Sequence, residues 1–354
     1  MPLRIAQVAP LYESVPPRFY GGTERVVSYL TEELVRRGHE VALFASGDSV
    51  TQARLIAPCK RALRLDPACA DQLAYHMVQL GMLLKEIAEF DVVHFHIDYL
   101  HFPVSQLITV PSLTTLHGRL DLPDLVPLYR EFADMPVVSI SNAQRMPLPW
   151  LNWLGTVYHG LPRDLFAFRE TRGTYLAFLG RISPEKGVED AIEIAKRAGM
   201  TLKIAAKVDP VDRAYFEADI KPLLRDPHIE YVGEITEHEK QDFLGNAYAL
   251  LFAINWPEPF GLVMIEAMAC GTPTIAYRRG SVPEVTEDGK TGFICTRVDE
   301  AVAALDRVAG LSRRRCREIF ETRFTVHQMV DGYLDLYHKL LSDTPLAAPR
   351  STAA

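Results

Sequence analysis

The sequence is poor in cysteine, in positive charge and in long apolar runs, and each shortage excludes a class of protein. Its five cysteines form no Cys-x-x-Cys pair and no Cys/His spacing typical of metal ligands, so they indicate reduced, scattered thiols and a cytoplasmic location. The formal net charge of −7 argues against a nucleic-acid-binding protein, because such proteins attract phosphates with an excess of Lys and Arg. No run of about 18 apolar residues occurs, so we expect no membrane span.

The length and the order of the predicted elements indicate two α/β domains. At 354 residues the chain is longer than one typical domain. The N-terminus, MPLRIAQVAP, lacks the length and cleavage site of a signal peptide and is predicted to be the first strand of a parallel α/β unit. We place the first domain at 1–165, the second at 166–343 and a flexible, Pro-containing tail at 344–354. The charged, irregular segment 163–172 is predicted to be the linker.

One short stretch, WPEPFGLVMIEAMACGT at 256–272, places two carboxylates around the start of a helix. Good helix formers at 262–269 follow Gly261, and a glycine ends them. Glu258 precedes the helix and Glu266 lies just over one turn inside it. The free amides of the helix start lie between them and favour an anion. This order suits a sugar, a diphosphate and a ribose joined together, although an ordinary strand–loop–helix unit with two surface glutamates has the same spacing.

The loop GRISPEKG at 180–187 gathers positive charge at a second predicted helix start. Lys186 is unfavourable there, because the helix dipole is already positive at that end. Arg181 lies five residues earlier, so the loop gathers two positive charges, and a bound phosphate would neutralise them. Two solvated surface cations are the alternative interpretation.

Other predicted strands also end in residues that suit a ligand. In open α/β sheets, ligands bind beyond the carboxyl ends of the strands. Gly21 and Gly22 follow the first strand and precede a helix at about 24–37, so the backbone there could approach an anion closely; a tight turn is the alternative. His117 ends another strand, where it could donate or accept a hydrogen bond or be a structural loop residue. Gly233 and Ile235 follow a strand in the second half, where a base or ribose could lie.

Three histidines near one strand invite a metal interpretation, which we disfavour. His94 and His96 share a face of the predicted strand at 91–96, and His101 follows it. No further ligand has a suitable spacing, and a metal site needs three or four ligands. We therefore predict no metal site.

Four motifs together resemble the retaining glycosyltransferases of family 4, which have the GT-B fold. The motifs are GGTE at 21–24, HG at 117–118, GRISPEKG at 180–187 and PEPFGLVMIEAMACGTPTIA at 257–276, in the family's order. The resemblance implies two facing Rossmann-like domains with the active site in the interdomain cleft, and a C-terminal helix that packs back towards the N-terminal domain. It also implies that the second domain holds most of a nucleotide-diphosphate sugar.

The resemblance further implies a role for each matching residue. Arg181 and Lys186 would bind the diphosphate and stabilise it as a leaving group. Glu258 would hold hydroxyls of the transferred sugar, Glu266 would hold the ribose hydroxyls, and His117 would face the sugar near the reacting centre. The predicted catalytic residues are thus His117, Arg181, Lys186 and Glu258, and the predicted donor-binding set adds Gly21, Gly22, Gly233, Ile235, Phe260, Gly261, Leu262 and Glu266.

The implied reaction retains the anomeric configuration and uses neither a cofactor nor a metal ion. In it the acceptor attacks from the face that the phosphate leaves, and the departing phosphate helps to deprotonate the acceptor. The sequence has no Asp-x-Asp pair, which the other glycosyltransferase fold uses for a metal-clamped diphosphate. Arg181, Lys186 and a helix N-terminus would neutralise the leaving charge instead. We predict a hexosyltransferase that uses a UDP-sugar first and a GDP-sugar second.

The sequence leaves the acceptor open between a sugar, another small molecule and a lipid-linked molecule. The segment 159–162 (HGLP) departs from the Asn-Gly-Val-Asp that is frequent in the family. Trp150 and Trp153 form an aromatic patch that is either core or acceptor-side surface, and a peripheral position at the inner membrane surface is a further option for this cytoplasmic protein. The basic cluster 313–317 is predicted to be a solvated face and not a lipid site. Rival functions are a phosphorylase, a nucleotide-sugar epimerase and a non-catalytic nucleotide-sugar-binding protein.

Overall fold

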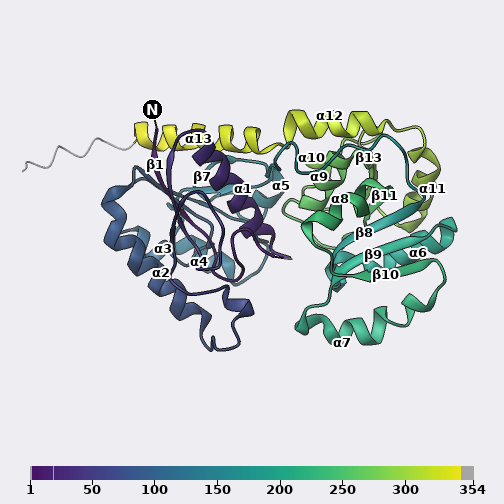
Figure 1. Cartoon of the computed structure of the whole chain (residues 1–354), viewed down its shortest axis with the longest axis horizontal. Helices are drawn as coiled ribbons and strands as arrows, with labels where there is room; N and C mark the ends of the chain where they lie inside the picture. The colour runs from purple at the N-terminus through teal and green to yellow at the C-terminus, as the bar shows by residue number, and fades with distance from the viewer. Residues whose placement is uncertain (1, 19, 344–354) are drawn as a thin grey trace, which may run out of the picture.

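Two parallel β-sheets, each covered by helices, make up the two halves of the molecule in Figure 1. The computed structural model describes residues 2–18 and 20–343. Within these residues the first sheet has the strand order β3-β2-β1-β4-β5-β6-β7 and the second the order β10-β9-β8-β11-β12-β13. The strands are β1 Arg4–Val8, β2 Glu40–Phe44, β3 Arg54–Ile56, β4 Val92–Phe95, β5 Ser112–Thr115, β6 Val137–Ser139, β7 Trp153–Thr156, β8 Tyr175–Arg181, β9 Leu202–Lys207, β10 Ile229–Gly233, β11 Ala247–Phe252, β12 Thr274–Tyr277 and β13 Gly292–Cys295.

The helices that pack on these sheets follow the predicted alternation. They are α1 Gly22–Arg36, α2 Gln72–Glu86, α3 Phe102–Ser105, α4 Leu125–Glu131, α5 Asn142–Arg145, α6 Val188–Ala198, α7 Arg213–Tyr215, α8 Glu237–Gly245, α9 Leu262–Cys270, α10 Val282–Val285, α11 Val298–Val308, α12 Arg313–Arg323 and α13 Val326–Asp343. Central strands such as β4 and β12 are buried along their whole length, because helices cover both faces of a parallel sheet. The α/β prediction is confirmed.

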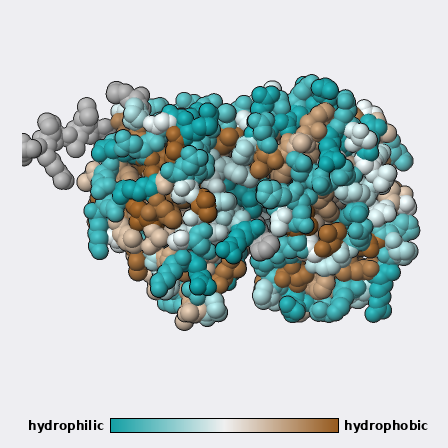
Figure 2. All heavy atoms as spheres, viewed as in Figure 1, coloured by the Kyte–Doolittle hydropathy of each residue, from teal (hydrophilic) through white to brown (hydrophobic). Residues whose placement is uncertain are grey.

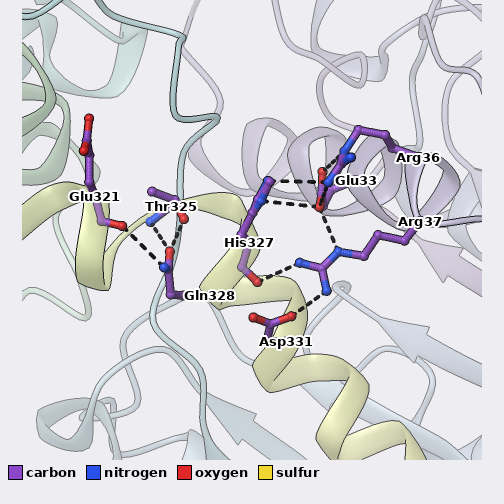
Figure 3. A network of polar contacts seen from close by, with 8 residues as sticks. All are labelled: Glu33, Arg36, Arg37, Glu321, Thr325, His327, Gln328 and Asp331. Atoms are coloured by element: carbon purple, nitrogen blue, oxygen red, sulfur yellow. Dashed lines mark hydrogen bonds and ion pairs between the residues drawn. The ribbon is translucent and has the colours of Figure 1, made fainter.

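The last helix, α13, returns from the second half of the molecule and packs on the first, as predicted (Figure 1). The apolar face of α13 packs into a core cluster of the first half that includes Ile5 and Val26. The α13 residues in this cluster include Met329, Val330, Tyr333 and Tyr337. The polar face of α13 is tied to α1, where Arg37 bridges Glu33 and Asp331 (Figure 3). The C-terminal helix therefore belongs structurally to the first domain, although it follows the second in sequence.

The segment 163–172, which was predicted to be the linker, is fastened to the second half by hydrogen bonds. Arg317 on α12 donates hydrogen bonds to the carbonyl oxygens of Arg163 and Phe166, each at 2.8 Å. Arg313 donates to the carbonyl oxygen of Arg169 at 2.7 Å. The predicted boundary at 165/166 falls inside this anchored segment, and the predicted tail at 344–354 lies outside the described residues.

The basic cluster at 313–317 was predicted as a solvated face, and this is wrong for two of its members. Arg313 is 3% exposed, and it also donates to the carbonyl oxygens of Ala247 and Gly245 at 3.0 and 2.8 Å. Arg313 and Arg317 lie one helical turn apart on the face of α12 that packs on α9, whereas Arg314 is exposed. None of the described helices is long and apolar enough to cross a membrane.

Candidate active site

A cleft of about 520 Å³ lies between the two sheets. Segments that follow β1, β4, β5, β8, β10 and β11 line it, so the carboxyl edges of both sheets face it. In Figure 2 hydrophilic residues gather where the two halves meet, on both sides of a notch at the lower edge of the view. Most of the predicted site residues line this cleft: Gly21, Gly22 and His117 from the first half, and Arg181, Lys186, Ile235, Glu258, Phe260, Gly261, Leu262 and Glu266 from the second. Gly233, at the end of β10, is not among the described residues that line the cleft.

The start of α9 has the backbone geometry that the sequence predicted. Gly261 has a φ of 79°, and a Cβ atom there would lie 2.9 Å from both the Met264 Cε and the Phe252 Cζ, so this position requires glycine. No side chain of the described residues caps the helix, which leaves its first amides available for an anion in the cleft. Across the cleft, a Cβ at Gly22 would lie 3.6 Å from the Leu262 Cδ1, so the glycine loop of the first half reaches the start of α9.

The two predicted phosphate-binding cations are held by carboxylates. The Lys186 Nζ lies 2.5 Å from the Glu258 Oε2, to which the Trp256 indole also donates at 3.0 Å. The Arg181 guanidinium donates to Glu185 at 2.5 Å, and Asp212 lies 3.5 Å from its Nε. Carboxylates that line or adjoin the cleft therefore hold both cations in place. An anion that enters the cleft would replace one of these carboxylates as the partner of the cation.

Glu266, the second carboxylate of the opening motif, is deeply buried and paired. Its side chain is 4% exposed, and the Lys240 Nζ lies 2.8 Å from its Oε1. Lys240 projects from α8, which packs beside α9. A buried carboxylate needs such a partner. Lys240 was not predicted, because 26 residues separate it from Glu266 and this spacing carries no local signal.

His117 lies in the cleft wall beside two further histidines. Its Nε2 is 2.9 Å from the Nδ1 of His96, and its ring stacks on that of His159 with centroids 5.3 Å apart. Burial lowers the pKa of His117 to about 3 and holds the pKa of His96 and His159 well below the usual value. All three rings are therefore neutral near pH 7.

The histidines that invited a metal interpretation bind protein groups instead. His94 pairs with Tyr337 and Thr115, each at 2.7 Å. His101 pairs with Ser105 and Thr114, at 2.6 and 2.8 Å. Because both nitrogens of each ring have protein partners, neither ring is placed as a ligand, and the described residues contain no cluster of three candidate metal ligands.

Asp98 is a further residue of the cleft, and it was not predicted. It lies three residues beyond β4 and is the one described non-glycine residue with a positive φ, of 49°. Its side chain is accessible within the cleft, yet the surrounding protein raises the pKa of its carboxyl to about 6 by desolvation. Backbone strain of this kind persists where a site over-determines it. The Asp-Tyr pair that follows the histidines gave no sequence signal for this conformation.

The exposed aromatic patch is smaller than the sequence suggested. Trp150 is 42% exposed, but Trp153 packs against a core cluster and donates its indole N–H to the Leu148 carbonyl at 2.9 Å. Arg145 also covers the Trp153 ring, at 5.3 Å from its centroid. Trp153 is thus partly buried against the core, and Trp150 lies on the surface.

Comparison with known proteins accounts for most of the chain. Residues 20–160 match the family model described as Glycosyltransferase Family 4, and residues 166–319 match that of Glycosyl transferases group 1. The chain is 24% identical to N-acetyl-alpha-D-glucosaminyl L-malate synthase of Bacillus anthracis, over 91% of this chain and 95% of the relative. Its fold is similar to sucrose-phosphate synthase of Thermosynechococcus elongatus (TM-score 0.80, 18% identity, 96% and 99% coverage) and to an Anabaena protein solved with UDP-glucose (0.71, 18%, 95% and 100%).

Proposed function

We propose that this chain, an enzyme that belongs to glycosyltransferase family 4 and has the GT-B fold, moves a hexose from a nucleotide-diphosphate sugar to an acceptor hydroxyl, with retention of configuration and without a metal ion. The observation that carries this proposal is one arrangement in the cleft. Arg181, Lys186 and the uncapped start of α9 line the same cleft as Glu258, which precedes α9, and Glu266, which lies within it. A diphosphate flanked by a sugar and a ribose fits that order of groups.

The positive groups would act as the diphosphate leaves. The bond between the anomeric carbon and the phosphate oxygen breaks, the acceptor oxygen bonds to the same face of that carbon, and the acceptor proton passes to the departing phosphate. Lys186 and the α9 amides would stabilise the charge that develops on the leaving oxygen, which is electrostatic preorganisation. Their fixed charge supports a metal-independent reaction, and the same-face route needs no protein nucleophile.

The remaining predicted residues would orient the donor. Glu258 would accept hydrogen bonds from sugar hydroxyls once Lys186 turns to the phosphate, and Glu266 would accept them from the ribose. Gly22 would admit the phosphates close to the backbone of the first domain. UDP-sugars are the first donors to test and GDP-sugars the second; the Anabaena neighbour, solved with UDP-glucose, supports that order. The acceptor, a sugar, another small molecule or a lipid-linked molecule, would enter from the first domain, and we propose a cytoplasmic location.

Replacement of Glu266 with alanine tests the donor site. We expect Glu266→Ala to weaken binding of the matching nucleoside diphosphate by about 10-fold or more, since hydrogen bonds to a charged group are worth roughly 1.5–3 kcal/mol. Glu230→Ala is the control, because Glu230 is a glutamate of β10 that pairs with Lys203 on the outer surface. Calorimetry with UDP, GDP and ADP measures the effect, and equal affinities in the wild type and Glu266→Ala would contradict the assignment.

Turnover separates transfer from its rivals. A transferase releases nucleoside diphosphate in proportion to the acceptor that is glycosylated. A phosphorylase would require inorganic phosphate, an epimerase would convert the donor without any acceptor, and a binding protein would show a thermal shift with no turnover across an acceptor panel. Any of these three results would refute the proposal.

A further inference from the structure

A chain of buried hydrogen bonds runs from the C-terminal helix to His117. The Gln7 Nε2 donates to the Tyr337 hydroxyl at 3.1 Å, and the Gln7 Oε1 lies 2.8 Å from the His96 Nε2. The other nitrogen of His96, Nδ1, lies 2.9 Å from the His117 Nε2. Gln7 is on β1, His96 follows β4 and Tyr337 is on α13, and all three are at most 1% exposed. Three separate segments are thus joined to one residue of the cleft.

The orientation of the Gln7 carboxamide, with its nitrogen towards Tyr337 and its oxygen towards His96, sets the direction of this series of hydrogen bonds. A carboxamide oxygen can only accept a hydrogen bond and its nitrogen can only donate. His96 must therefore carry its hydrogen on Nε2, where it faces the Gln7 oxygen, and its Nδ1 must be bare. The His117 Nε2 must then donate to that bare nitrogen. Because both rings are neutral, the Nδ1 of His117 is left with a lone pair and no hydrogen.

A second arm has the same direction and supports this assignment. The Tyr337 oxygen accepts from Gln7, so its own hydrogen is available for the Nδ1 of His94, 2.7 Å away. The His94 Nε2 then donates to the Thr115 hydroxyl, which in turn donates to Tyr333 at 3.0 Å. With the Gln7 carboxamide in this orientation, each contact along the two arms pairs one donor with one acceptor.

The series of hydrogen bonds ends at an atom without a partner. The Nδ1 of His117 is buried and has no hydrogen-bond partner among residues 2–18 and 20–343. A buried polar atom left unpaired costs free energy that a ligand group would recover. A lone pair is matched by a hydrogen-bond donor, such as a hydroxyl, and His117 is among the residues that line the cleft.

We propose that Gln7, His96 and Tyr337 are positioning residues that hold His117 in the Nε2–H tautomer, so that it accepts a hydrogen bond from a hydroxyl of the bound sugar. The identity of that ligand rests on the proposed function. His117 then cannot serve as a proton donor to the leaving group or to the acceptor. Gln7 and Tyr337 lie outside both family-model matches, which cover 20–160 and 166–319, so the matches do not account for either residue.

The tautomer is measured directly in the free protein. Long-range 1H–15N correlation spectra of the full chain, labelled in histidine, distinguish a protonated from a bare ring nitrogen, and His117→Asn identifies the signals of His117. We expect a neutral His117 with hydrogen on Nε2 and a bare Nδ1. Hydrogen on Nδ1 would overturn the proposal.

A matched pair of variants tests the positioning role. Tyr337 and Tyr333 are both fully buried, lie one turn apart on α13 and pack against His94, but only Tyr337 contacts Gln7. Tyr337→Phe frees the Gln7 carboxamide, so we expect a mixture of His117 tautomers and a fall in kcat/KM on the order of 5-fold, the factor for one neutral hydrogen bond. Tyr333→Phe should lose similar thermal stability but keep the tautomer and a rate within about twofold of wild type.

The outcomes separate this proposal from the proposed function. If Tyr337→Phe matches Tyr333→Phe in both tautomer and rate while the wild type turns over, the positioning chain is refuted. If UDP-glucose or GDP-mannose binds and turns over but leaves the His117 Nδ1 signal unmoved, the hydroxyl contact is refuted. If no nucleotide sugar binds or turns over, the proposed function fails and the hydroxyl contact fails with it, whereas the tautomer measurement still decides the positioning chain.

Discussion

Lys186→Met tests most directly how the cleft neutralises a leaving diphosphate. The Lys186 Nζ lies 2.5 Å from the Glu258 Oε2 and 5.0 Å from the centroid of the Trp256 ring, and the side chain is 15% exposed. Methionine keeps the apolar stem of lysine against the indole and removes the ammonium group, with its charge and its contact to Glu258. The substitution therefore separates electrostatics from packing.

The expected loss is larger in the transition state than in the bound state. Removing one preorganised donor for developing negative charge costs about 10²- to 10³-fold in kcat, or roughly 3–4 kcal/mol. Binding of the intact diphosphate loses less, because Lys186 must first give up Glu258, and the net gain from such an exchange is about 1 kcal/mol. We expect the affinity for nucleoside diphosphate to fall by only about 5-fold.

The control is a lysine with the same kinds of contact outside the described cleft lining. Lys203 on β9 lies 3.0 Å from Glu230 and 5.0 Å from the centroid of the Tyr175 ring. Lys203→Met should leave kcat within about twofold of wild type, because surface ion pairs contribute little. The assay is acceptor-dependent release of nucleoside diphosphate, with calorimetry for affinity. Turnover of Lys186→Met within threefold of wild type, or an equal loss in Lys203→Met, would refute the reasoning.

Two further substitutions probe stability. Desolvation raises the pKa of Asp98 to about 6, above the ~3.9 of an unfolded aspartate. The folded state thus binds more protons than the unfolded state and loses stability as the pH rises from about 4 to 6. Asparagine tolerates the positive φ at this position. In thermal scans across pH, the melting temperature of Asp98→Asn should exceed that of the wild type at pH 7 and equal it below pH 4. A difference in melting temperature that does not change with pH would contradict this assignment. Arg313→Ala leaves several buried carbonyls unpaired and should lower the free energy of unfolding, measured in urea, by about 3–5 kcal/mol. Arg314→Ala, at the exposed neighbour, should change it by less than about 0.5 kcal/mol. Equal losses in the two variants would show that the burial of Arg313 does not matter.

Local signals were sufficient for the elements of the donor half. The stretch at 256–272 contains its own start and stop, and the structure places α9 at Leu262–Cys270 between Gly261 and Gly271, both with positive φ. Glycine and proline act on the backbone next to them, so the helix starts and ends that they set can be predicted from a single sequence. The same holds for Gly187, which has a φ of 67° at the start of α6. The assignments of Lys186 and Glu258 to one site used the family resemblance, since 72 residues separate them.

Partners that are distant in sequence were out of reach. Arg313 and Arg314 are adjacent and identical in type, yet one is buried against backbone carbonyls and the other is exposed, because only the packing of α12 on α9 decides which face is covered. His94 on β4 and His96 just after it gave a similar ambiguity. Their partners include Gln7 and Tyr337, 330 residues apart, and no spacing rule connects those positions.

The position of the interdomain pivot follows from two chain crossings that the sequence did not bring together. The chain passes from the first domain to the second near Leu161 and returns to the first near Thr325. These crossings lie side by side: the Leu161 amide donates to the Phe324 carbonyl at 2.9 Å, and the Val326 amide donates to the Leu161 carbonyl at 2.8 Å. A Cβ at Gly160 would lie 2.2 Å from the Thr325 oxygen, so glycine is required for this approach.

Because the predicted linker at 163–172 is fastened to the second domain, we infer that closure around a donor would rotate both crossings together at 160–161 and 325. α13 would then move with the first domain and keep the contact between Tyr337 and Gln7 through the motion. Small-angle scattering with and without UDP tests this, and we expect a smaller radius of gyration in the nucleotide complex. Identical profiles at a saturating concentration of UDP would contradict a pivoting cleft.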